Sequence, residues 1–139
     1  IEEVIVLRLF LALLAAGAWA AVVFRLGLEQ RVAGVLAGSV FVLLGLYGAW
    51  AGYRWPGLRG FRWARFVVVG LSLVHLVAFA LPMLSYRIIH WDEIFSKIEF
   101  WGLAGPEFHA VSTRYFSFWM AVTLGMVLVE RLQARAGRK

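Results

Sequence analysis

The fold is decided by residues 4–24, which read VIVLRLFLALLAAGAWAAVVF and carry one charged side chain, Arg8. A helix needs about 20 predominantly apolar residues to cross the ~30 Å hydrocarbon core of a bilayer. Three further apolar stretches follow at residues 32–53, 66–84 and 115–129. The sequence therefore predicts an all-α integral membrane protein, a single domain over residues 1–139, whose four transmembrane helices form an antiparallel bundle.

The amino-acid composition agrees with this prediction. Hydrophobic residues make up 63% of the chain and charged residues 16%, whereas soluble domains contain about 45–50% and about 25%. A water-soluble core of this size could not hide so much apolar surface. The chain has no cysteine, which excludes disulfide frameworks, thiolate metal sites and thiol nucleophiles.

The placement of basic residues predicts the orientation of the spans. With four spans, both termini and the middle loop share one side, and basic residues near span ends stay cytoplasmic. That side carries Arg8, Arg54, Arg59, Arg62, Arg65, Arg131, Arg135, Arg138 and Lys139. We therefore expect a multi-pass protein of the bacterial inner membrane with both termini cytoplasmic. Its expected partners are the lipid bilayer and anionic lipid headgroups at the inner face, and nucleic acid is not among them.

Tryptophan positions give a second, independent indication of depth. Trp prefers the membrane–water interface, where its ring is half buried and its N–H finds a partner. The predicted spans place none of the seven tryptophans at mid-membrane. The outer level is expected to hold Trp19, Trp91, Trp101 and Trp119, and the inner level Trp50, Trp55 and Trp63.

Small residues recur at helical spacing on the first two predicted spans. The first span carries Ala12, Ala16 and Ala20, and the second carries Gly34, Gly38, Gly45, Gly48 and Gly52. Small residues four apart make a flat strip that another helix can approach closely. We expect these residues to be helix-packing positions. Two interpretations stay open: the first two spans pack against each other as a tight hairpin, or the strip contacts a second protein or a second copy.

His75 is the one ionisable residue in the middle of a predicted span, and such a residue is a functional candidate by default. A neutral, hydrogen-bonded His75 is one interpretation, with three candidate partners: Ser39, Ser72 and Thr123. A haem or metal ligand is another, for which Met126 is the nearest second ligand, although no cofactor is predicted. A proton or substrate relay is the third. Pro82 is expected to kink the same span and to free a backbone carbonyl.

The loop at residues 87–112 is predicted to lie on the extracytoplasmic side. Its apolar residues recur at helical spacing, at Trp91, Ile94, Phe95, Ile98, Phe100 and Trp101, with charged residues between them. This pattern predicts an amphipathic helix lying in the interface plane between the third and fourth spans. Pro106 and Glu107 then indicate the start of the fourth helix, because proline suits the first helical position and an acid favours the N-terminal dipole.

The same loop holds the candidate outer-face docking or ligand site: His90, Trp91, Glu93, Glu107, His109 and Arg114. His90 and Glu93 are three apart, so on a helix they could share a metal ion with His109 or Glu107. The spacing is not a known metal signature, and no metal site is predicted. A structural role at the interface and a surface for a partner protein are the other two interpretations. Arg114 is expected to pair with Glu107, a lipid phosphate or a partner protein.

Three functional hypotheses follow. The first is a non-catalytic subunit or accessory factor of a larger membrane complex, in contact with other membrane-protein subunits. The second is a small transporter or channel built as a homo-oligomer. The third is a membrane enzyme or electron carrier that uses His75, His90 or His109. No nucleophile, base and orienting group are brought together by a local motif, so no catalytic residue is predicted.

Overall fold

The structure, a computed structural model, describes residues 4–138, and four of its helices are long and apolar enough to cross a membrane. Lys139, one of the basic residues assigned to the inner side, lies outside the described residues. The third long helix consists of three consecutive segments, α3, η2 and α4, which we call the third span. The elements are α1 (Ile5–Val23), α2 (Gln30–Arg54), α3 (Ala64–Val74), η2 (His75–Ala80), α4 (Leu81–Ile89), η3 (Phe95–Lys97), β1 (Glu99–Phe100), β2 (Leu103–Ala104) and α5 (Gly105–Ala136).

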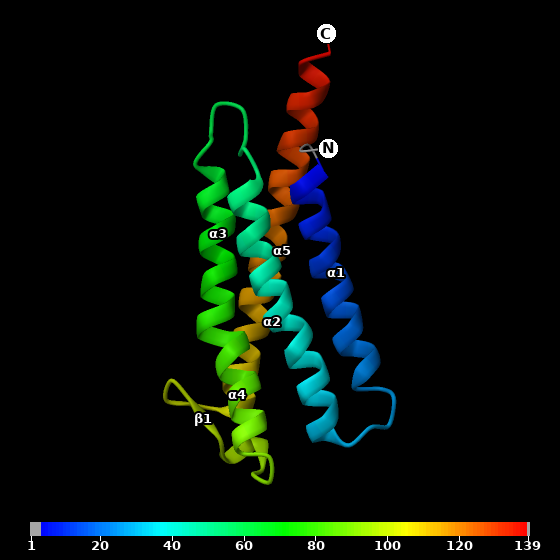
Figure 1. Ribbon diagram of the computed structural model, residues 1–139, viewed down its shortest axis with the longest axis vertical. Helices are drawn as coiled ribbons and strands as arrows, with labels where there is room; N and C mark the ends of the chain where they lie inside the picture. The colour runs from blue at the N-terminus through cyan, green and yellow to red at the C-terminus, as the bar shows by residue number, and fades with distance from the viewer. Residues whose placement is uncertain (1–3, 139) are drawn as a thin grey trace.

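The long helices lie side by side along the longest axis of the molecule (Figure 1). One end carries the two ends of the chain and the loop at residues 55–63, and we call it the arginine-rich end. The opposite end carries the connections at residues 24–29 and 90–104, and we call it the hairpin end. Helix α2 packs against α1 and against the third span, and α5 packs against α1, α3 and η2.

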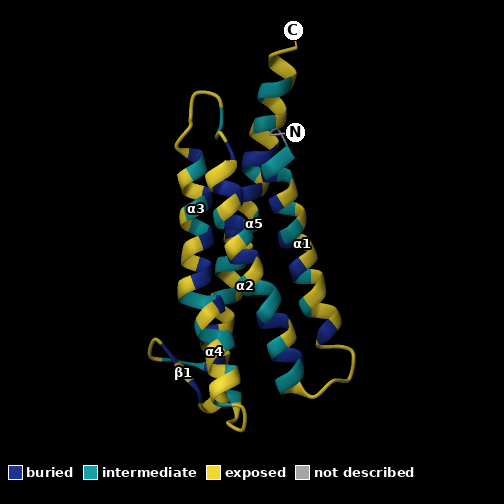
Figure 2. Cartoon of the chain, in the orientation of Figure 1, coloured by how far each residue is buried: buried dark blue, intermediate teal, exposed yellow. Residues whose placement is uncertain are grey.

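The helices bury one face each and leave large apolar side chains on the outside (Figure 2). The main core contains Leu9 and Leu13 of α1, Val68 of α3 and Trp119 of α5, each at most 2% exposed. Leu43, Leu46, Val77 and Leu128 are each more than half exposed although they lie in the middle of their helices. The molecule therefore has an apolar interior and an apolar exterior, a combination that marks an interaction surface for a membrane or another protein.

The glycines of α2 face the third span. A Cβ atom added to Gly45 would lie 3.0 Å from Leu76 Cβ, and one added to Gly52 would lie 2.9 Å from Val69 N. The series continues with Gly38 against Leu84, Gly48 against Ser72, and Gly34 against Arg87. The glycines thus bring the backbone of α2 close to the third span, while α1 and α2 also pack against each other, as the predicted hairpin requires.

The third span contains a π-helical turn, η2, directly before Pro82. In a regular α-helix the carbonyl of Ala78 would accept a hydrogen bond from the N–H of residue 82, and proline has none. The indole N–H of Trp101 donates to this carbonyl at 2.9 Å. A second side-chain donor, the hydroxyl of Tyr115, reaches the carbonyl of Leu71 at 2.6 Å. Side chains from later in the chain thus supply donors to the third span, at the π-helical turn and in the α-helical turn before it.

The predicted amphipathic helix between the third and fourth spans does not form. Residues 90–104 instead make a turn, the short 3-10 helix η3, and an antiparallel pair in which β1 joins β2. Trp101 and Gly102 form the two-residue connection with φ angles of 54° and 82°, as the mirror-image hairpin turns require. The prediction of a helix that begins at Pro106 is confirmed, because α5 starts at Gly105 with Pro106 in its first turn.

Packing explains why the hairpin replaces the predicted helix. Ile98, Phe100 and Phe108 form a second buried cluster, and the rings of Phe100 and Phe108 stack with centroids 4.4 Å apart. Phe79 and Met83 of the third span pack against this cluster. Phe95, Ile98 and Phe100 of the loop therefore cover the third span and α5 of the protein itself, while Trp91, Ile94 and Trp101 remain exposed. In a short segment, apolar residues that a hairpin buries can recur at the same spacing as those on one face of a surface helix, so the sequence does not distinguish the two structures.

Candidate ligand-binding cavity

His75 is 3% exposed and lies at the first position of η2. Its Nε2 is 3.1 Å from the backbone carbonyl oxygen of Phe41 on α2. Because a carbonyl only accepts, Nε2 is the donor in this pair, and Nδ1 of the neutral ring is left as an acceptor. The predicted partners are wrong: the hydroxyls of Ser39, Ser72 and Thr123 each donate to the carbonyl four residues earlier in their own helix.

Trp119 lies beside His75 in the interior, with ring centroids 4.9 Å apart. Its exposed fraction is 0%, so Trp119 does not have the half-buried environment that is expected of a tryptophan at a membrane interface. Within residues 4–138, the buried side-chain nitrogens without a hydrogen-bond partner are Nδ1 of His75, Nε1 of Trp119 and Nε of Arg65. The first two belong to neighbouring rings, so the middle of the bundle holds one unpaired acceptor and one unpaired donor.

A cavity of about 250 Å³ extends from His75 toward the hairpin end. All four long helices line it, each with residues from the half nearer the hairpin end. Its apolar wall consists of Phe24, Phe41, Phe79, Met83 and Phe116, and its polar side chains are His75, Arg87, His109, Ser112 and Thr113. A mostly apolar concave site with a few polar groups is the usual form of a small-molecule site.

Several of the predicted helix-packing residues line this cavity. Ala20, Gly34 and Gly38 are wall residues, whereas Ala16 is buried in the main core and Ala12 packs against that core. The small side chains toward the hairpin end of α1 and α2 thus leave open space. Farther along α2, Gly45, Gly48 and Gly52 bring the backbone against the third span.

Arg87 at the mouth of the cavity is a residue that the sequence did not single out. A Cβ atom on Gly34 would lie 2.6 Å from Cζ of Arg87, so the guanidinium occupies the space that this glycine leaves. The same Cζ lies 4.6 Å from the centre of the Phe95 ring, a cation–π contact. The side chain is half-buried. In the sequence, Arg87 can be recognised only as a basic residue in the last turn of an apolar helix.

The predicted outer-face cluster is only partly brought together. His90 Nδ1 lies 2.9 Å from Glu93 Oε1, while Glu107 and Arg114 are exposed on α5 and form no ion pair within the described part of the chain. His109 instead lines the cavity. No group of three metal-ligating side chains gathers anywhere in residues 4–138. The structure therefore does not join His109 or Glu107 to the pair formed by His90 and Glu93.

Arg31 connects the two loops of the hairpin end. Its guanidinium lies 2.6 Å from Glu29 and 2.8 Å from Asp92, and it stacks over the ring of Trp91 at 5.1 Å. Trp91, a predicted docking residue, is therefore engaged within the chain. Arg31 itself was not predicted as a site residue, because its partner Asp92 lies 61 positions away in the sequence.

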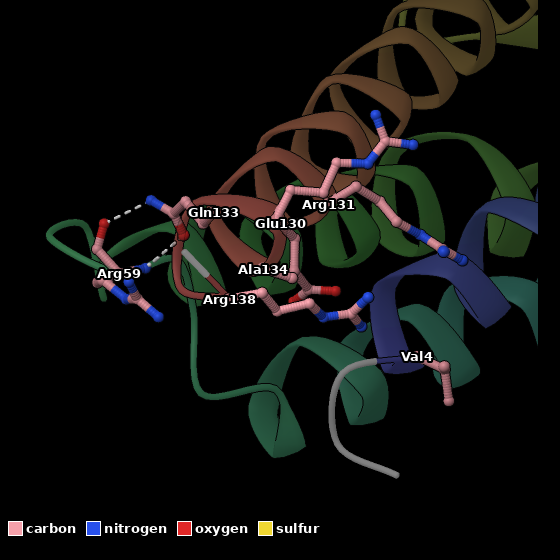
Figure 3. A pocket seen from close by; sticks show the side chains of 8 residues that line it. Val4, Arg59, Glu130, Arg131, Gln133, Ala134 and Arg138 are labelled. Carbon is pink, nitrogen blue, oxygen red and sulfur yellow. Dashed lines mark hydrogen bonds between the residues drawn. The ribbon is translucent and has the colours of Figure 1, made fainter.

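The arginine-rich end holds a second hollow, of about 380 Å³ (Figure 3). The amide side chain of Gln133 pairs there with the backbone of Arg59, accepting from its N–H at 2.9 Å and donating to its carbonyl at 2.8 Å. Nearby, the buried Trp55 donates to Glu130 at 2.7 Å. The basic residues that line the hollow are Arg59, Arg131, Arg135 and Arg138.

Comparison with known proteins finds no family model, no curated protein and no solved structure that matches this chain. Functional inference therefore starts from the cavity and from the distribution of charge and apolar surface.

Proposed function

We propose that this chain is an integral protein of the bacterial inner membrane, with four helices crossing as an antiparallel bundle and both termini in the cytoplasm. Apolar side chains on the outside of all four long helices support insertion, because a bilayer is the solvent that such a surface prefers. The arginines at the arginine-rich end support the orientation, since basic residues near span ends remain cytoplasmic. They also suit contact with anionic lipid headgroups.

The absence of cysteine from the sequence allows a direct test of topology. Phe61→Cys places a single thiol in the loop at the arginine-rich end, and Ile94→Cys places one at the hairpin end; both positions are exposed. A membrane-impermeant maleimide applied to intact spheroplasts is expected to label Ile94→Cys alone, and Phe61→Cys only after lysis. Labelling in the reverse pattern contradicts the orientation, and recovery of the protein from the aqueous fraction contradicts insertion.

Within the membrane, we propose that the chain acts as a non-catalytic accessory component of a larger complex and holds a small amphipathic molecule in its cavity. The single observation that supports binding is the cavity itself, which combines walls from all four long helices with a few polar side chains. Native mass spectrometry, described next, distinguishes a complex with other membrane subunits from a homo-oligomer of this chain.

Gentle extraction followed by native mass spectrometry tests this proposal. The expected result is a bound small molecule together with other membrane subunits. Ala20→Phe fills the cavity and is expected to remove the small molecule, whereas Ala18→Phe, on the exposed face of the same helix, is expected to retain it. A chain that always runs alone and carries no small molecule contradicts both parts of the proposal.

A second candidate function is a homo-oligomeric transporter or channel. It is favoured by the extent of the cavity, which reaches from Arg87 near the end of the third span to His75 in its middle. His75→Ala is then expected to abolish a flux in liposomes, and an unchanged flux removes this candidate. The hypothesis of a membrane enzyme or electron carrier stays a prediction, to be tested by the absorption spectrum and metal content of the purified protein.

A further inference from the structure

We propose that the cavity binds a single-chain amphiphile with an anionic headgroup, a carboxylate or a phosphate, which Arg87 holds at the mouth. This inference rests on the proposed membrane insertion and names the class of ligand for the proposed binding site.

The ion pairs of the hairpin end do not include Arg87, and two further acids of this end, Glu99 and Glu107, are exposed and form no ion pair within residues 4–138. Arg31 takes the carboxylates of Glu29 and Asp92, and Glu93 pairs with His90. The side chain of Arg87 forms no hydrogen bond or ion pair with another residue within 4–138. Arg31 and Arg87 lie at the same end of the bundle but differ in their ion pairs. Arg31 pairs with two carboxylates, whereas Arg87 pairs with no described carboxylate.

The position of Arg87 makes an unpaired guanidinium costly. It is half-buried between Gly34 of α2 and the ring of Phe95, and partial burial of a cation is unfavourable unless hydrogen bonds and charge compensate. The ring of Phe95 offers a cation–π contact but accepts none of the five N–H donors of the guanidinium. A carboxylate or phosphate matches those donors in charge, and two of its oxygens can accept two parallel N–H bonds from the planar guanidinium.

The cavity below Arg87 fits a hydrocarbon chain. Its large apolar side chains are phenylalanines and one methionine, and Phe41, Phe79 and Phe116 come from three different helices; the other apolar wall residues are alanines and glycines. His75 marks the far end, twelve positions before Arg87, which corresponds to about 18 Å along a helix. A volume of about 250 Å³ is at the small end for ligand sites, which favours one chain over the two chains of a phospholipid.

Polar groups at the rim also suit an anionic headgroup. His109 and Ser112 of α5 line the same cavity as Arg87 and carry side-chain donors. The site therefore has an apolar interior and a polar, cationic mouth, and the side chain of His75 bounds the apolar part at its far end.

Binding of matched probes to the full chain in phosphatidylcholine nanodiscs tests the proposal. The probes share one chain length and differ in headgroup: dodecanoate, dodecyl phosphate, dodecanol and dodecyltrimethylammonium. The two anions are expected to bind about tenfold or more tightly than dodecanol, and the cation more weakly still. Binding of dodecanoate alone assigns the site to free fatty acids, and binding of both anions leaves phosphate-headed single-chain lipids as ligands too.

Arg87→Gln is expected to reduce the affinity for dodecanoate about tenfold or more without changing the affinity for dodecanol. Arg31→Gln is the matched control, because Arg31 is already paired, and it is expected to leave both affinities unchanged. If Arg87→Gln does not fold, Ala20→Phe keeps the cation and blocks the chain site, so all probes should lose affinity. Equal binding of dodecanol and dodecanoate, or anion binding that survives Arg87→Gln, overturns the inference while leaving membrane insertion intact.

Discussion

The indole N–H of Trp101 donates to the backbone carbonyl of Ala78 at 2.9 Å, across 23 positions of sequence. Residue 82, which would be the donor in a regular α-helix, is a proline and has no N–H. The β-hairpin therefore supplies a side-chain donor to the third span at its π-helical turn. If the third span crosses a membrane as proposed, its backbone groups must be satisfied within the protein, which gives this contact a structural importance that its exposed ring does not suggest.

The first prediction concerns this hydrogen bond. Trp101→Phe is expected to destabilise the protein by about 1–3 kcal/mol, because the carbonyl of Ala78 loses a donor. Reversible unfolding in mixed micelles measures the effect. In a Pro82→Ala background the same substitution should cost less, since residue 82 then has an N–H of its own. An equal loss in both backgrounds would show that Trp101 contributes through its ring alone.

A second prediction concerns the close approach of α2 and α3. Gly52→Ala is expected to destabilise the protein by about 1–3 kcal/mol, because the added methyl would lie 2.9 Å from the backbone nitrogen of Val69. Gly70→Ala is the control on the neighbouring helix, where an added Cβ meets nothing within 4 Å. That change should be neutral or stabilising. Similar unfolding curves for the two variants would contradict the packing described here.

The buried hydrogen bond at the arginine-rich end supplies a third prediction. Trp55→Phe removes the donor to Glu130 and is expected to cost about 1.5–3 kcal/mol, the usual range for a hydrogen bond to a charged group. Trp50→Phe changes a ring that is 56% exposed and should alter stability much less. The comparison uses unfolding of both variants in the same detergent. A larger loss of stability for Trp50→Phe than for Trp55→Phe would contradict the importance of the hydrogen bond between Trp55 and Glu130.

A fourth prediction separates local order from global stability. Arg31→Gln removes the link to Asp92 and Trp91, but the Asp92 side chain is 95% exposed, so global stability should fall by no more than about 1 kcal/mol. Hydrogen exchange at residues 90–93 should become faster, and the difference should shrink at high salt. Arg25→Gln, at an exposed position of the neighbouring loop, is the control. Unchanged exchange in Arg31→Gln would mean that the ion pair does not order this loop.

The long helices could be predicted because hydropathy and helix-start residues are local signals. The four apolar stretches, the start of α5 at Gly105 and the effect of Pro82 all depend on residues close together in the sequence. The hairpin at Glu99–Ala104 could not be distinguished from an amphipathic helix in the same way. Its form is set by packing on Phe79 and Phe108, and the sequence alone does not show which residues meet there.

The cavity was predicted only in part, for the same reason. His75 stood out as an ionisable residue in an apolar span, but its partner is a backbone carbonyl, which every residue carries. Arg87 looked like an ordinary basic residue at a helix end. Its contact with Gly34 joins helices that are 53 positions apart, and the lack of a carboxylate beside it becomes visible only when the other acids have been placed.

The loop at residues 55–63 is held by side chains that are synthesised much later. Trp55 precedes Glu130 by 75 positions, and Arg59 precedes Gln133 by 74. During translation this segment therefore emerges before either anchor exists, and only arrival of α5 supplies them. In the proposed topology, a nascent chain stalled ahead of α5 should leave this loop open to cytosolic protease. Docking of α5 would then be a distinct final stage of maturation, which protection of the loop from protease can follow.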